Sequence, residues 1–245
     1  MSAILEGKNL TKFFGGLTAV KEVDFYLGRE EIVGLIGPNG AGKTTLFNLI
    51  SGIFPADAGT LLFNGQAIKG LKSFEICRLG IARTFQIVRP FLKMSCLENV
   101  LVGIIGRNEK EGRRGEDKKE EAADLLKFVG LTGEEKKLAQ NLTLIQKKRL
   151  EVARALATRP KVILLDEVLA GLNPSEIHQA LELIEVIRRD RKVTLFWIEH
   201  VMGAIMKASD RIIVLDQGKK IKEGKPGEVV SDQRVIEAYL GEPDA

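Results

Sequence analysis

Residues 37–44 have the types and spacing of a loop that binds a polyphosphate. They read Gly37-Pro38-Asn39-Gly40-Ala41-Gly42-Lys43-Thr44 and match the pattern GxxxxGK[ST]. In such a loop successive backbone N–H groups face the phosphates, and glycines permit the close approach. Lys43 is expected to neutralise the β- and γ-phosphates, and the Thr44 hydroxyl to ligate Mg²⁺. The loop alone does not separate an ATPase from a GTPase or a small-molecule kinase.

Two carboxylates end an apolar run further along the chain. Residues 162–167 read Val-Ile-Leu-Leu-Asp-Glu, which predicts a strand ending at the sheet edge where open α/β folds bind ligands. We expect Asp166 to hold Mg²⁺ and Glu167 to orient or deprotonate the attacking water; two acids that merely open a loop are the alternative. His200 follows another apolar run. A lone histidine is usually structural, but this position favours contact with the γ-phosphate.

Hydrophobic patterns and turn residues predict the elements that position these side chains. In the first part of the chain we expect strands over 3–5, 19–27 and 31–36, a helix from Lys43 to a Gly52 cap, and a hairpin at Asn64–Gly65. The run 31–36 is continuously apolar, as in a strand buried on both faces of a mostly parallel sheet. In the last part we expect a βαβ unit (strands 162–165 and 193–198, helix 175–189), a hairpin of strands 211–215 and 219–222 joined at Gln217–Gly218, and a terminal helix over 226–240.

The middle of the chain has a different character. Around residues 86–155 the charge rises and helical spacing dominates, which predicts a helical subdomain. Residues 107–121 are almost wholly polar. We interpret this charge run as a solvated loop or helix end rather than a specific binding site.

Composition excludes several classes of protein. The 245 residues are 44% hydrophobic and 29% charged with a mean hydropathy of 0.00, which excludes disordered, collagen-like and coiled-coil chains. Cys77 and Cys96 form no CxxC pair, which argues against a disulfide framework or a zinc site. A net charge of +4 favours phosphate-bearing ligands but is too small to indicate nucleic acid. Without a long apolar stretch or a signal peptide, the sequence predicts a cytosolic protein.

With these segments in this order, the chain resembles the ATP-binding-cassette (ABC) ATPases over essentially its whole length. Residues 37–45 resemble the family's Walker A motif, residues 162–167 its Walker B motif and residues 10–15 its A-loop. Gln86 fits the Q-loop, residues 170–173 stand at the D-loop, and His200 stands at the switch histidine. Four segments resemble most closely the sequences of the ATP-binding subunits of bacterial importers for branched-chain amino acids. They are residues 83–91, 97–103, 167–176 and 198–202.

The resemblance implies a P-loop NTPase of ABC type. Its α/β fold would combine a mixed-sheet core with an N-terminal antiparallel β subdomain and an inserted α-helical subdomain. The expected divisions are a nucleotide-binding core (1–86 and 156–225), a helical subdomain (87–155) and a C-terminal helix and tail (226–245). The implied site residues are catalytic Lys43, Gln86, Glu167 and His200; ATP-binding Phe14, which would stack on adenine, Val20, Gly37, Pro38, Asn39, Gly40, Ala41, Gly42, Lys43, Thr44, Thr45, Thr143 and Gln146; and Mg²⁺-binding Thr44, Gln86 and Asp166.

The chain departs from the family pattern at the signature motif. LSGGQ in the family falls at Leu142-Thr143-Leu144-Ile145-Gln146, so both glycines are replaced. In the family this loop contacts the γ-phosphate held by the opposite subunit. Leu144 and Ile145 add bulk where the backbone must approach that phosphate, and a β-branched isoleucine disfavours a positive φ angle. We hypothesise that the site completed for a partner is weakened, which favours a heterodimer over a homodimer. The alternative is that this branch of the family tolerates the variant loop through remodelled contacts.

The resemblance also implies partners and a place of action. A second ABC ATPase subunit, two integral-membrane permease subunits and, indirectly, an external solute-binding protein are expected, with no nucleic acid. The chain would then be a peripheral protein at the cytoplasmic face of the inner membrane. Residues 87–94 are expected to form part of the coupling surface to the permeases, with an ordinary packed loop as the alternative. The sequence has no guanine-reading NKxD, which disfavours a GTPase; a lipid-exporter ATPase or a soluble ABC protein remains the alternative.

Overall fold

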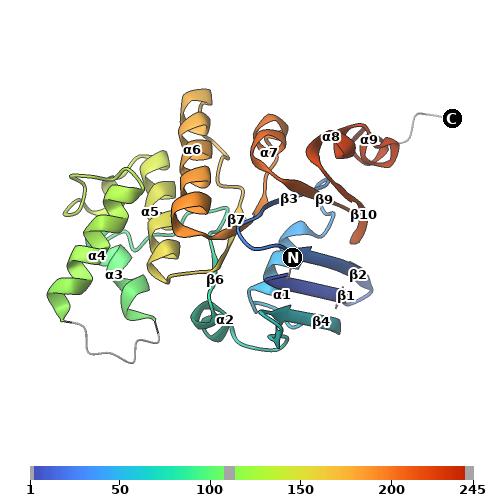
Figure 1. Ribbon diagram of the computed structural model, residues 1–245, viewed down its shortest axis with the longest axis horizontal. Helices are drawn as coiled ribbons and strands as arrows, with labels where there is room; N and C mark the ends of the chain where they lie inside the picture. Colours follow the sequence, from blue (N-terminus) through green and yellow to red (C-terminus); the bar gives the residue numbers. More distant parts are fainter. Residues whose placement is uncertain (1–2, 108–113, 241–245) are drawn as a thin grey trace.

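The structure is a computed structural model that describes residues 3–107 and 114–240. It contains two β-sheets and a group of helices beside the larger sheet (Figure 1). The smaller sheet is antiparallel, in the order β2 (Leu17–Leu27), β1 (Leu5–Phe14), β4 (Ala58–Phe63), β5 (Gln66–Ala67). The larger has the order β10 (Lys219–Gly224), β9 (Arg211–Asp216), β3 (Ile32–Ile36), β8 (Thr194–Ile198), β7 (Val162–Asp166), β6 (Ile81–Arg83). Its strands pair in parallel except for β10, which is antiparallel to β9. The sheet is therefore mixed.

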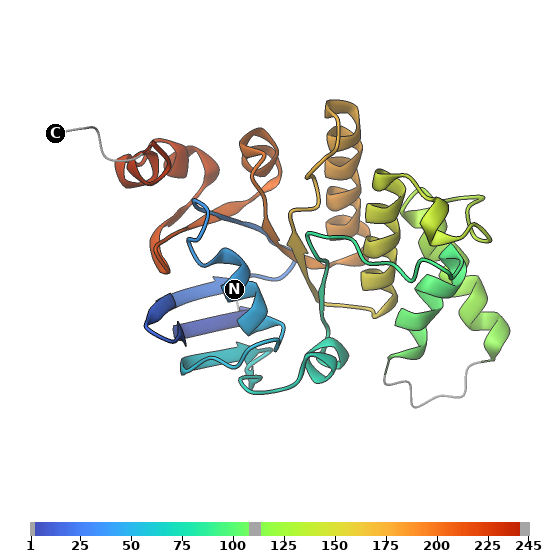
Figure 2. The ribbon, with the colours of Figure 1, turned by 180° about the vertical axis from the view of Figure 1, so that it is seen from behind.

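The helices are arranged around this larger sheet. They are α1 (Lys43–Ile50), α2 (Ser73–Leu79), α3 (Cys96–Ile105), α4 (Gly115–Phe128), α5 (Leu144–Ala157), α6 (Pro174–Arg191), α7 (Met202–Ala208), α8 (Pro226–Val230) and α9 (Gln233–Leu240), with a short 3₁₀ turn at Ala139–Asn141. Helices α3, α4 and α5 pack on one another and form the helical arm next to α6 that both ribbon views show (Figures 1 and 2). None of the described helices combines the length and the apolar character that a bilayer crossing demands.

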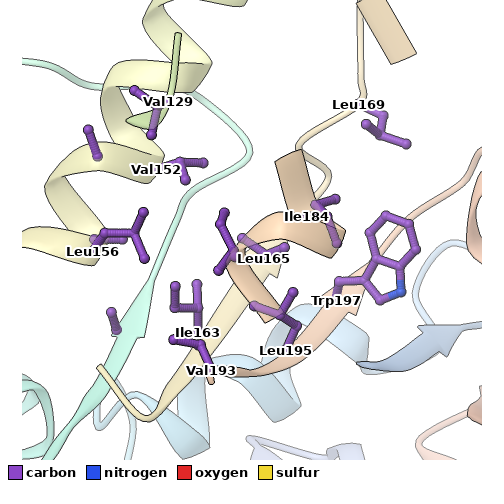
Figure 3. Packing of buried hydrophobic residues seen from close by; sticks show 14 of the residues in the cluster. Val129, Val152, Leu156, Ile163, Leu165, Leu169, Ile184, Val193, Leu195 and Trp197 are labelled. Atoms are coloured by element: carbon purple, nitrogen blue, oxygen red, sulfur yellow. The ribbon is translucent and has the colours of Figure 1, made fainter. Parts of the chain in front are cut away.

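Both faces of the larger sheet are buried at its central strands β3, β7 and β8. In β8, Leu195 and Trp197 belong to the cluster that reaches the helical arm (Figure 3), whereas Phe196 and Ile198 belong to the cluster around α1 and the smaller sheet. Because successive side chains of a strand point to opposite faces, a strand covered on both sides must be apolar at every position. This confirms the interpretation of the continuous apolar runs as central strands of a mostly parallel sheet.

Several predicted elements are confirmed. The βαβ unit is β7, α6 and β8, and β7 and β8 are parallel neighbours. Asn64 and Gly65 have positive φ and join β4 to β5, and Gln217 and Gly218 do the same between β9 and β10. Helix α1 ends at Ile50, and Gly52 follows with a φ of 69°.

Two predicted elements were wrong in extent. The first strand, expected over 3–5, runs to Phe14, because β2 and β4 pair with it on both sides and compensate for its glycine and polar residues. The terminal helix expected over 226–240 is broken between α8 and α9. The Ser231 hydroxyl donates to the Gly227 carbonyl, and Asp232 Oδ1 accepts from the Arg234 N–H, so these two side chains end one helix and start the next.

The structure describes only part of the charge run, and it leaves the domain boundaries as predictions. Residues 108–113 of the charge run and the tail 241–245 lie outside the described residues. The carboxyl end of the run is the start of α4, and Arg107 forms two hydrogen bonds to Glu121 across it. The boundaries of core and helical subdomain stay predictions; α5 continues past the one placed at residue 155.

Candidate functional site

The phosphate loop connects β3 to α1 and depends on glycine at two close approaches. A Cβ on Gly37 would lie 2.0 Å from the Leu215 carbonyl oxygen, and one on Gly42 would lie 2.4 Å from the Ala19 carbonyl oxygen. Gly42 also caps α1 with a φ of 99°. Because α1 begins directly after it, the unpaired N–H groups and positive end of the helix dipole point into the loop. The local fold is therefore suited to an anion.

The Lys43 side chain folds back and bonds the backbone of its own loop. Its Nζ donates to the carbonyl oxygens of Gly37 at 2.6 Å and Pro38 at 2.9 Å. Burial lowers the pKa of Lys43, and the charges of Glu167 and Asp166 act in the opposite direction. The ammonium thus lies between the phosphate loop and the two carboxylates that end β7.

Two predicted catalytic residues, Gln86 and His200, contact a third, Glu167. Gln86 Nε2 donates to Glu167 Oε2 at 2.6 Å, and His200 Nε2 lies 3.0 Å from Glu167 Oε1. The three side chains come from segments that follow β6, β7 and β8, whose carboxyl ends share one edge of the sheet. The backbone of Glu167 has a φ of 49° and its N–H donates to the Ile198 carbonyl. This fixes the carboxylate between the amide and the imidazole.

Asp166 is buried and paired with an arginine. Its Oδ2 lies 2.8 Å from Arg83 Nη2, and both side chains are nearly inaccessible. Burial raises the pKa of Asp166, whereas the Arg83 guanidinium and its hydrogen bond lower it. Thr44 and Asp166 line the same cavity, and a hydroxyl and a carboxylate are hard oxygen ligands of the kind Mg²⁺ takes together with substrate phosphates. In the described part of the chain, no three His, Cys, Asp or Glu side chains are grouped to hold a metal by themselves.

A pocket of about 670 Å³ extends from the phosphate loop to the smaller sheet. Phe14 lines it, with its ring edge-on to Phe54 at 5.3 Å between centroids. Val20 does not line it: the side chain has 0% exposure and belongs to the hydrophobic core, and its contact with ATP stays a prediction. Its neighbours Thr18 and Ala19 line the pocket. The remaining lining residues are Leu17, Asn39, Gly40, Ala41, Gly42, Lys43, Thr44, Thr45, Glu167, His200 and Gln217.

The signature segment lies away from this pocket and caps α5. Thr143 Oγ1 accepts from the Gln146 N–H, and Gln146 Oε1 accepts from the Thr143 N–H, which is a capping box. Leu144 and Ile145 lie in the first turn of the helix, with no positive φ at either residue. The segment therefore starts the helix without requiring a positive φ of Ile145. The Leu144 side chain instead lies against Gly171 of the D-loop, 3.1 Å from where a Cβ would be.

A second cavity, of about 680 Å³, separates the larger sheet from the helical arm. Its lining includes Arg83, Phe85, Gln86, Ile87 and Arg89. Several apolar side chains here are exposed, among them Phe85 at 47% and Ile87 at 66%. We call this cavity the arm groove. It begins at Asp166 and Thr44 and opens to the surface at the segment predicted to couple to a partner.

Sequence reasoning missed two groups at the site. Arg83 was included only in the segment around the Q-loop and was assigned no role, although its side chain bonds Asp166. Lys148 of α5 donates from Nζ to the Glu167 carbonyl oxygen at 3.3 Å. A basic residue at each position was visible, but nothing in the local sequence indicates a partner 83 or 19 residues away.

A glycine-rich phosphate loop between a parallel strand and a helix, with two carboxylates at the end of a neighbouring strand, defines a P-loop nucleotide-binding protein. A protein-family model described as "ABC transporter" matches residues 20–170, and one described as "Branched-chain amino acid ATP-binding cassette transporter" matches residues 219–245. The chain belongs to the ABC transporter family, and it is an ATPase of that family's fold.

Individual proteins are similar to the chain over nearly its whole length. The chain is 41% identical to the high-affinity branched-chain amino acid transport ATP-binding protein BraF of Pseudomonas aeruginosa, over 98% of each chain. It is 40% identical to LivG of Escherichia coli, which carries the same description, with the same coverage. Among solved structures, the ADP conformation of MJ1267, an ATP-binding cassette of an ABC transporter, superposes with a TM-score of 0.90 at 33% identity, covering 99% of this chain and 100% of that one. A dimeric MJ0796 cassette bound to ADP and Pi has a TM-score of 0.82 at 25% identity, covering 91% and 98%.

Proposed function

We propose that this chain is the ATP-hydrolysing subunit of an importer for branched-chain amino acids, acting on separate membrane permease subunits. The observation that carries the hydrolytic role is the contact of Glu167 with both Gln86 and His200 beside the phosphate loop. The solute class rests on the names of relatives that match the chain from end to end. No residue of the site reads the solute, which is left to the membrane and solute-binding partners.

The residues would divide the reaction as follows. Phe14 stacks on adenine, and the N–H groups and Lys43 of the phosphate loop hold the β- and γ-phosphates. Thr44 and Asp166, with Gln86, would hold Mg²⁺, which supplies charge neutralisation on the phosphates. Glu167 accepts a proton from, or orients, the water that attacks the γ-phosphate, and His200 holds the transferred phosphoryl oxygens.

Dimerisation would complete the site. In the proposed closed state the signature segment of one subunit faces the ATP held by the other, so Thr143 and Gln146 act in trans. Leu144 is 47% exposed at the helix start, and with Ile145 it adds bulk where the family has glycine. This bulk, rather than backbone strain, supports a second, different ABC subunit as partner.

The arm groove is the proposed docking surface for the permeases. Its lining combines exposed apolar side chains with Gln86, which contacts the proposed hydrolytic carboxylate Glu167. Binding and hydrolysis of ATP would move the helical arm relative to the larger sheet, and the permeases would follow. The chain would then work as a peripheral protein on the cytoplasmic side of the inner membrane.

Substitution of Glu167 by glutamine tests the hydrolytic role. Glu167→Gln keeps the side-chain shape but removes the base, so ATP turnover should fall by roughly 10²–10⁴-fold while ATP affinity stays within about twofold. The matched control is Glu120→Gln on the exposed face of α4, which should leave turnover unchanged. Turnover is measured by phosphate release from the chain assembled with its partners, and affinity by fluorescence of a labelled nucleotide. Unchanged turnover in Glu167→Gln would remove Glu167 from this role.

A further inference from the structure

Arg83 joins the metal-binding end of the site to the helix of the phosphate loop. The residue ends β6, and its side chain is only 6% exposed. Nη2 donates to Asp166 Oδ2 at 2.8 Å, which leaves the other carboxylate oxygen of Asp166 available. An ion pair this deeply buried is held in one geometry rather than exchanging with solvent.

The other arm of the same guanidinium reaches α1. Nη1 donates to Asn48 Oδ1 at 2.7 Å and to Ser51 Oγ at 3.0 Å. Helix α1 carries Thr44 in its first turn. One planar group therefore fixes the distance between Asp166 on β7 and the helix that presents Thr44.

Packing holds the guanidinium in its plane. The Phe47 ring centroid lies 5.7 Å from Arg83 Cζ, and the Phe85 centroid lies 5.1 Å from it. Among the described residues, Arg83 Nε is buried and has no hydrogen-bond acceptor. A buried donor without a partner destabilises a fold, so this arginine is not explained by stability alone.

We propose that Arg83 is a positioning residue for the Mg²⁺·nucleotide site: it aims Asp166 at the metal and sets the spacing between Asp166 and Thr44. The role rests on the proposed function, since it acts through two residues assigned to Mg²⁺. Lysine cannot reproduce it, because a point charge cannot bond a carboxylate and α1 at once in a planar fork. Phe85, which stacks on Arg83, also lines the arm groove, so a docked partner would touch the same assembly.

The proposal is tested by the Mg²⁺ dependence of nucleotide binding, which does not require turnover. The affinity of a fluorescent ADP is measured with Mg²⁺ and in EDTA, and Mg²⁺ is titrated at fixed nucleotide. Loss of a residue that orients a metal ligand costs about 10–100-fold in metal affinity, so we expect half-saturation of Arg83→Lys at about 10-fold more Mg²⁺. Binding in EDTA should stay within about twofold of the parent chain.

Arg188→Lys is the matched control, because the Arg188 guanidinium also bonds two side chains, Asp210 and Glu185, but lies away from the site. Thermal unfolding of both variants separates lost folding from lost positioning. In an Asp166→Asn background, Arg83→Lys should cause no further change in Mg²⁺ half-saturation, because the carboxylate that it positions is gone. An unchanged Mg²⁺ dependence in folded Arg83→Lys, or an additive effect in the Asp166→Asn background, would overturn the proposal. Failure of the parent chain to bind the nucleotide at all would instead refute the proposed function.

Discussion

Glu199 is a buried carboxyl group whose protonation should make stability depend on pH. It is 2% exposed, next to His200, and its Oε1 accepts a hydrogen bond from the Leu169 N–H at 2.7 Å. Burial raises the pKa of Glu199 from 4.5 to about 7, against the opposing effects of backbone N–H groups and Lys148. Glu199→Gln keeps an oxygen acceptor for Leu169 but cannot ionise.

The size of this change in the free energy of unfolding follows from the linkage between proton binding and folding. The native state binds the Glu199 proton more tightly than the unfolded state, so the free energy of unfolding falls as pH rises from about 4.5 to about 7 and is constant above. At about 1.4 kcal/mol for each unit of pKa, the full penalty is about 3 kcal/mol. The advantage of Glu199→Gln over the parent chain should therefore grow by about 2–3 kcal/mol between pH 5 and pH 8. For a chain of this length that is about 5–10 °C in Tm.

Urea unfolding of both chains at several pH values measures this difference directly. Subtracting the parent chain from the variant cancels every other group that titrates and any constant effect of the amide. Glu120→Gln on the exposed surface provides the control and should show no pH-dependent difference. If the difference between Glu199→Gln and the parent chain is the same at pH 5 and pH 8, Glu199 ionises in the native state like an exposed carboxylate, and the argument from burial is wrong.

Three further predictions concern the surfaces around the site. Ile87→Glu should abolish co-purification with the permeases while Ile105→Glu should not, because both side chains are 66% exposed but only Ile87 lines the arm groove. Tyr239→Phe should raise the Kd for ATP by about 2–10-fold in a fluorescence titration without changing Tm by more than a few degrees, because the hydroxyl of this α9 residue accepts a hydrogen bond of 2.8 Å from the Gly37 N–H; equal affinities would show that α9 does not steady the phosphate loop. Leu144→Gly with Ile145→Gly should raise ATP turnover of the assembled complex, and unchanged turnover would count against the heterodimer.

Local chemistry explains which elements were predictable. The two positive-φ hairpins and the βαβ unit follow from short stretches of sequence, in which turn residues or continuous apolar runs leave one conformation favoured. The length of β1 and the break before α9 were not predictable in this way. The first is imposed by pairing on both edges, and the second depends on Asp232, whose carboxylate also bonds Lys222 of β10.

In the site too, contacts that follow from local sequence patterns were predictable, and contacts that depend on packing were not. That Glu167 and His200 lie close together could be expected, because each follows a strand of the predicted βαβ unit, whereas Gln86 was indicated only by its resemblance to the Q-loop. The burial of Val20 in the core depends on how β2 packs, which residue type alone does not indicate. The partner of Arg83 depends on how β6, β7 and α1 pack, which no local pattern encodes.

Helix α5 of the helical arm is bonded to the segments that carry Gln86 and Glu167 through two hydrogen bonds to their backbone. Glu151 Oε1 accepts from the Phe85 N–H, next to Gln86, and Lys148 Nζ donates to the Glu167 carbonyl. A residue other than glycine at positive φ persists only where its surroundings hold it there, and Glu167 is held by Lys148 on one side and by the Ile198 carbonyl on the other. A shift of α5 must therefore move the segments that present Gln86 and Glu167 together, and α5 starts at the signature segment. The same helix that would sense the partner's ATP thus sets the position of this chain's own carboxylate.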